Sequence, residues 1–116
     1  MNEYEVTLVV DWNREETRRN EFTHYKERLP QVLHNFGFTV DELTGERYED
    51  KDEDGYVYEE GYRGRLVVRK DVYAPNMRRA LRTAQEILTG VLGRSGEEND
   101  EDAPADWCRA PDYWFV

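Results

Sequence analysis

The sequence predicts an α+β fold, in which an antiparallel sheet is covered on one face by two helices. Three observations predict it. Apolar and polar residues alternate over residues 4–12, which is typical of a half-buried strand. Apolar residues recur at helical spacing over residues 75–92, which indicates an amphipathic helix. Between them, residues 65–73 are rich in strand-forming side chains.

The first strand is followed by a helix whose apolar stripe is interrupted by a proline. The strand's apolar positions are Tyr4, Val6, Leu8, Val10 and Trp12. Val9 falls on the polar face, which predicts a central strand. The helical stripe consists of Phe22, Tyr25, Leu29, Val32, Leu33 and Phe36, with Gly37 ending the helix. Because Pro30 lacks an N–H and its ring collides with the carbonyl of Lys26, we expect a kink or a break there.

Two strands and a second helix complete the middle of the chain. Phe38 to Leu43 predicts a strand, and Thr44-Gly45 predicts a turn or bulge. Arg65 to Tyr73 predicts the next strand. The helix that follows should hold Pro75 in its first turn and Gly93 just past its end.

The order of these elements predicts a ferredoxin-like βαββαβ sandwich, with an antiparallel sheet and two helices packed on one face. We expect residues 1–93 to form the α+β core and residues 94–106 an acidic, flexible linker. The aromatic segment 107–116 should add the last strand of the same domain. That fold hosts many activities and by itself indicates none.

Composition restricts the class of protein. A chain of 116 residues with 38% apolar content is long enough for one domain with a modest core. It has no apolar run of membrane-spanning length and begins without a signal-peptide pattern, so we expect a cytoplasmic protein that does not bind membranes. The lone Cys108 agrees with a reducing compartment.

The net charge of -10 is the strongest functional signal. Acids gather in the middle of the chain, between Glu42 and Glu60, and again between Glu97 and Asp102. If both clusters share a face, their field favours a basic protein surface, with carboxylates standing where phosphates would. We therefore expect a small non-enzymatic interaction protein, a nucleic-acid mimic or inhibitor of the kind that suits a compact phage genome. The expected partner-binding residues are Glu49, Asp50, Asp52, Glu53, Asp54, Glu59, Glu60, Trp107 and Trp114. The alternative is that acidity serves solubility or salt adaptation.

A second hypothesis concerns a divalent cation. The segment from Asp50 to Gly55 matches the opening of a calcium loop, with Asp50, Asp52 and Asp54 as oxygen ligands. The match fails at the twelfth position, where Gly61 replaces the bidentate glutamate. The alternative is an acidic hairpin tip whose charges stay solvated. A calcium or small-ligand site is thus the second functional hypothesis, and no other cofactor is expected.

Direct nucleic-acid binding and catalysis have less support. The element order is shared with the RNA-recognition motif, but Arg65 and Val67 occupy the positions where that motif has base-stacking rings. The negative charge also repels a phosphate backbone. Ser95, Cys108 and the two histidines, His24 and His34, form no nucleophile–base or metal pattern. Because one sheet face stays open, we also expect a homodimer through that face.

Overall fold

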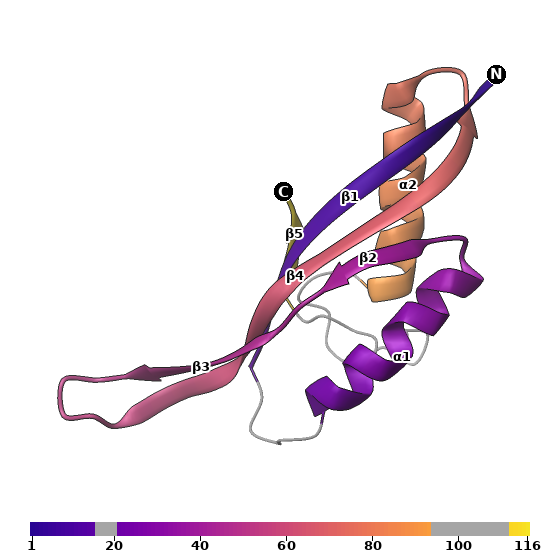
Figure 1. The fold of residues 1–116 in the computed structure, drawn as a ribbon. Helices are drawn as coiled ribbons and strands as arrows, with labels where there is room; N and C mark the ends of the chain where they lie inside the picture. Colours follow the sequence, from indigo (N-terminus) through magenta and orange to yellow (C-terminus); the bar gives the residue numbers. More distant parts are fainter. Residues whose placement is uncertain (16–20, 94–111) are drawn as a thin grey trace.

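The computed structural model describes the backbone of residues 1–15, 21–93 and 112–116 (Figure 1). These residues form an α+β fold with a five-stranded antiparallel sheet and two helices on one side of it. The elements in chain order are β1 (Asn2–Glu15), α1 (Glu21–Asn35), β2 (Thr39–Leu43), β3 (Glu46–Lys51), β4 (Val57–Ala74), α2 (Met77–Leu92) and β5 (Asp112–Phe115).

The strands run in the order β2-β4-β1-β5, and β3 also pairs with β4. The expected sandwich had four strands, whereas the described residues contain five. The additional strand is β3, and β4 begins at Val57 instead of Arg65. The sequence pattern did not reveal either because this segment is charged, and charged residues have low strand propensity. The ladder of backbone hydrogen bonds between the two segments holds them in strand form.

The core lies between the sheet and the helices. Alternate residues of β1 point into it, and their partners on β4 do the same, as in the pairs Leu8–Val68 and Val10–Leu66. The remaining alternate positions form an open face, over which neither α1 nor α2 lies (Figure 1). Val9 lies half-buried on this open face, and β1 has a strand on each side, as expected for a central strand.

Helix α1 runs through Pro30 without a break, so of the two expected outcomes, a kink or a break, the break is wrong. A proline inside a helix costs about 3 kcal/mol. Leu29 and Leu33 on the same helix are fully buried, and burying each contributes about 1.5–3 kcal/mol, which offsets that cost. The stripe ends earlier than expected, because Phe36 lies past the helix and is 51% exposed.

Helix α2 begins slightly later than the sequence predicts. Asn76 is its N-cap, with its side-chain oxygen accepting the N–H of Arg79 at 2.9 Å. Pro75 therefore precedes the cap and does not lie in the first turn. Gly93 follows the last helical residue, as expected. No helix among the described residues has the length and apolarity needed to cross a membrane.

The most unusual feature is a two-stranded arm, formed by β3 and the facing part of β4 and defined here as residues 46–63. It extends away from the helices at one end of the molecule (Figure 1). The molecule is accordingly elongated, with extents of 59 × 30 × 22 Å.

Candidate interaction site

Arginines neutralise several acids on the open sheet face. Arg65 donates two hydrogen bonds to Asp11, from Nε to Oδ1 at 2.8 Å and from Nη2 to Oδ2 at 3.3 Å. The hydrogen bond and charge of Asp11 raise the pKa of Arg65 above its usual value. Arg69 binds Asp41 at 2.6 Å, which raises the pKa of Arg69, and reaches Glu5 at 3.8 Å. The acids of this face are thus partly satisfied within the chain.

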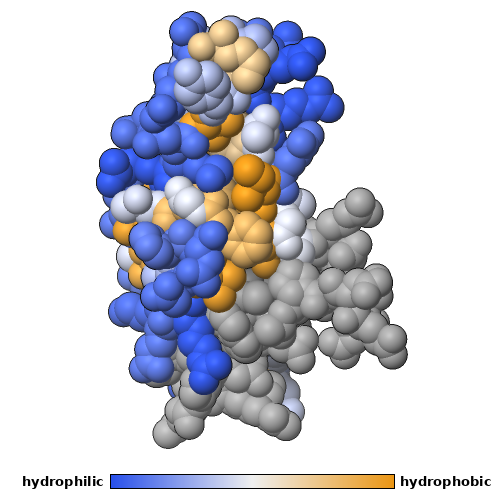
Figure 2. All heavy atoms as spheres, turned by 90° about the vertical axis from the view of Figure 1, so that its right-hand side faces the viewer, coloured by the Kyte–Doolittle hydropathy of each residue, from blue (hydrophilic) through white to orange (hydrophobic). Residues whose placement is uncertain are grey.

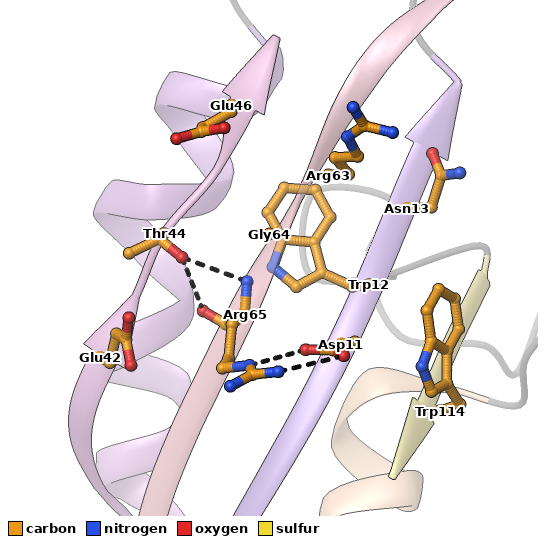
Figure 3. Close-up of a pocket in the computed structure, with 10 residues that line it drawn as sticks. All are labelled: Asp11, Trp12, Asn13, Glu42, Thr44, Glu46, Arg63, Gly64, Arg65 and Trp114. Carbon is orange, nitrogen blue, oxygen red and sulfur yellow. Dashed lines mark hydrogen bonds and ion pairs between the residues drawn. The ribbon is translucent and has the colours of Figure 1, made fainter. Parts of the chain in front are cut away.

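A hollow of about 660 Å³ lies on this face where β1, β2, β4, β5 and the start of β3 come together (Figure 3). Trp114 stands directly across from Asp11 on the neighbouring strand and is 53% exposed. The Arg65–Asp11 pair lies between Trp114 and Glu42 (Figure 3). The lining residues are Asp11, Trp12, Asn13, Glu42, Thr44, Glu46, Arg63, Gly64, Arg65 and Trp114. Of the predicted site residues that the structure describes, only Trp114 lines it.

The hollow is shaped by a close approach of two backbones. Thr44 and Arg65 exchange backbone hydrogen bonds of 2.9 and 3.3 Å, and the Thr44 hydroxyl accepts the Arg65 N–H at 3.2 Å. A Cβ on Gly64 would overlap the Thr44 carbonyl and lie 2.8 Å from the Cα of Gly45. Only glycine leaves room for this approach, which occurs at the base of the arm.

The tip of the arm is organised by one carboxylate. Oδ1 of Asp52 accepts the backbone N–H of Asp54 at 3.0 Å and that of Tyr56 at 2.8 Å. Gly55 adopts a φ of 81°, a conformation that favours glycine. The tip is therefore an Asp-stabilised turn, which agrees with one of the two interpretations that the sequence left open.

Two like-charged pairs follow one another in the arm. Glu49 lies opposite Glu60, and Asp50 lies opposite Glu59. Arg47 bridges the first pair, at 3.4 Å from Glu49 and 3.1 Å from Glu60. In the second pair, the Tyr48 hydroxyl donates to Glu59 at 3.1 Å.

Other acids of the arm have no basic partner among the described residues. Within the described part of the chain, no basic side chain forms an ion pair with Asp50, Asp52, Glu53 or Asp54. Tyr56 and Tyr58 stand beside these acids and are 72% and 64% exposed. The end of the arm thus presents negative charge and aromatic rings together.

The predicted partner-binding residues fall into three groups. The seven acids all lie on the arm, and Trp114 lies on the open face of the sheet. Trp107 and the second acidic cluster, 97–102, are outside the described residues, so the convergence of the two clusters stays a prediction. Ser95 and Cys108 are likewise outside them, whereas His34 is exposed at the end of α1.

The predicted calcium ligands gain no geometric support. Residues 1–15, 21–93 and 112–116 contain no group of three or more His, Cys, Asp or Glu side chains placed to hold a metal ion. A cation site at Asp50, Asp52 and Asp54 therefore remains a prediction. Sequence reasoning missed the hollow because its residues come from all five strands and from the β2–β3 connection. The sequence feature that could have indicated this region is the presence of charged residues at alternate positions of the two central strands, β1 and β4.

Comparison with models of protein families, with curated proteins and with solved structures finds no match for this chain. The geometry of the described residues is therefore the basis for assigning a function.

Proposed function

We propose that this chain is a non-enzymatic interaction protein that binds a basic surface of another protein, and that the arm makes the contact. The observation that carries this proposal is the succession of two acid–acid pairs across the strands of the arm. Like charges directly opposite each other destabilise a strand pair by a few tenths to about 1 kcal/mol. Cations supplied by a partner would remove that repulsion on binding.

Charge distribution distinguishes this proposal from a role in solubility alone. Residues 46–63 carry eight acidic and three basic side chains, an excess of five acids within a net charge of -10. Solubility is served by acids at any exposed position, including positions without a facing acid. Concentrating them in opposed pairs on a narrow projection costs stability, which favours a role in recognition.

The shape of the arm supports the same interpretation. Two strands with no helix over them fit into a groove more readily than the broad face of the sheet does. Tyr56 and Tyr58 supply rigid aromatic side chains at its exposed end, and aromatic residues are enriched among the residues that dominate binding energy. Rows of carboxylates along both strands would occupy a groove built for a phosphate backbone, so the partner we propose is a nucleic-acid-binding protein that this chain inhibits.

We further propose that the fold is a ferredoxin-like sandwich whose second strand is interrupted. In this interpretation β2 and β3 are one strand, broken at Thr44–Gly45. It is supported by the pairing of both segments with β4. It assigns no activity, because this architecture hosts unrelated functions.

A defined probe tests the proposed contact. A labelled oligo-lysine peptide of about ten residues should bind the protein at low salt, with an affinity that falls as salt rises. The variant Asp50→Asn/Glu59→Gln should bind it several-fold more weakly. The matched control is Glu27→Gln/Glu86→Gln, which removes the same charge from exposed positions on the helices. Equal loss in both variants would show that only net charge matters and would contradict a role for the arm.

A competition experiment tests the mimicry. Basic proteins captured by the wild type from a lysate should be released by duplex DNA and should not be captured by Asp50→Asn/Glu59→Gln. Retention in the presence of excess DNA would contradict binding in a nucleic-acid groove.

A further inference from the structure

The described residues cover the outer edge of β1 only in part. β5 pairs with Val10 to Asn13, and the last contact along this edge is the hydrogen bond from the Val116 N–H to the Val9 carbonyl, 2.9 Å. Among the described residues, Asn2 to Leu8 pair with β4 alone. Successive residues of a strand direct their backbone groups to opposite sides. Glu3, Glu5 and Thr7 therefore present their N–H and C=O groups along an open edge, in line with Val9. Figure 2 shows how polar and apolar side chains are distributed over the surface on one side of the molecule.

This edge differs from the opposite one. On the β2–β3 side, the ladder with β4 shifts register between Val40 and Glu42 and again between Asp50 and Lys51. Such irregularities disfavour the pairing of an additional strand. β1 instead keeps one continuous register with β4 over its whole length, from Asn2 to Glu15. Over residues 2–8, where β5 does not pair with it, β1 therefore forms a regular edge of the sheet.

We propose that this edge of β1, residues 2–8, binds an extended basic segment of a partner protein as an added strand. Side chains of an added strand alternate between the two faces of the sheet. On the open face they would lie beside Glu3 and Glu5, which are both exposed and favour lysine or arginine. Glu5 also lies 3.8 Å from Arg69, but its side chain is still 61% exposed. On the helix-covered face they would lie beside the row Tyr4, Val6 and Leu8, which favours apolar residues. The occupant is thus a segment that alternates basic and apolar residues.

Charge argues against a second copy of the chain at this edge. Antiparallel pairing of two β1 strands centred on this segment sets Glu5 opposite Glu5 or Glu3 of the second copy. Such pairs are unfavourable. This edge is a different surface from the arm. The inference therefore does not depend on the proposed function.

Amide exchange measured residue by residue tests the inference with a defined probe. The probe is an acetylated and amidated peptide that alternates lysine and valine. Its length is about eight residues, which is within the usual range for a strand. In the free protein, the amides of Tyr4, Val6 and Leu8 should exchange slowly because they bond to β4, whereas those of Glu3, Glu5 and Thr7 should exchange fast. The peptide should slow the second set by about tenfold or more at saturation. A peptide alternating glutamate and valine should leave it unchanged.

Two variants separate strand addition from simple charge attraction. Thr7→Pro removes an N–H that faces the open edge and leaves the ladder with β4 intact, so it should weaken peptide binding about tenfold. Thr7→Val keeps the N–H and should bind like the wild type, and both should melt cooperatively. The arm variant Asp50→Asn/Glu59→Gln should retain the protection of Glu3, Glu5 and Thr7.

Three results would overturn the inference. Protection of these three amides in the free protein that grows with protein concentration would show that a second copy covers the edge. Peptide binding without their protection would place the peptide elsewhere. Equal binding by Thr7→Pro and Thr7→Val would exclude backbone pairing.

Discussion

Asp50 and Glu59 face each other on one side of the arm, and only the Tyr48 hydroxyl, bound to Glu59 at 3.1 Å, offsets their charges within the described residues. The adjacent pair, Glu49 and Glu60, is bridged by Arg47. The arm therefore holds one compensated acid pair next to one that is barely compensated. Among the described residues, neither Asp50 nor Glu59 forms an ion pair.

Replacing Asp50 by asparagine should stabilise the protein. The change removes the repulsion from Glu59 and should raise the free energy of unfolding by a few tenths to about 1 kcal/mol. Thermal melting measures it, and added salt should stabilise the wild type more than the variant because salt screens the repulsion. Glu53→Gln, at the exposed tip, is the control and should change little. A lower melting temperature for Asp50→Asn would show that the pair is not repulsive in the folded state.

Replacing Gly64 by alanine should destabilise the protein strongly, by about 2 kcal/mol or more, because the added Cβ meets the backbone of Thr44 and Gly45. Gly90 offers a control in the same chain, since a Cβ there meets nothing within 4 Å. Gly90→Ala lies in helix α2 and should stabilise by about 0.5–1 kcal/mol. Denaturant unfolding of the two variants measures this difference. A neutral Gly64→Ala would mean that the strands can separate at the base of the arm without cost.

Asp52→Ala should loosen the tip of the arm while leaving the body folded. It removes the acceptor of the Asp54 and Tyr56 amides, so both should exchange about tenfold faster. Asp52→Asn retains an acceptor oxygen and should keep most of the protection. Titration of the wild type with millimolar calcium provides a second readout. Protection of the tip by calcium, lost in Asp52→Asn, would establish the cation site instead of a purely structural turn.

Leu88→Ala should cost about 2–5 kcal/mol, since this side chain is fully buried against the sheet. Leu81, on the same helix, is 39% exposed, and Leu81→Ala should cost clearly less. Chemical denaturation of both variants compares them. Equal losses would mean that α2 packs on a different face from the one described.

The sequence predicts the elements whose apolar residues recur with a regular period. The apolar stripe of α2 and the alternation in β1 follow from burial on one side, and the burial of apolar surface contributes most of the free energy that favours folding. The predicted break at Pro30 is wrong because the prediction considered only the local cost of a proline in a helix. It did not include the free energy gained by burying the two leucines near it on the same helix. The arm is missed because its local sequence does not favour strands. Its strand form depends on pairing between β3 and β4, which the local pattern of a charged segment does not reveal.

The candidate site is predicted in part. The acids of the arm stand out in composition alone, and the structure places them on one projection. The hollow depends on the register of five strands and on Gly64 lying against Thr44, neither of which has a short sequence signature. The facing of Asp50 and Glu59 likewise depends on the register of the hairpin.

Strand β4 belongs both to the arm and to the sheet, running from Val57 to Ala74 and leading directly into α2. No linker separates the two regions along this strand. A partner that pulls or twists the arm would therefore exert torque on the central strands themselves. The force needed to unfold the domain should therefore differ between pulling at the tip of the arm, at Asp52, and pulling at α2. This difference follows because β4 is continuous between the arm and the sheet.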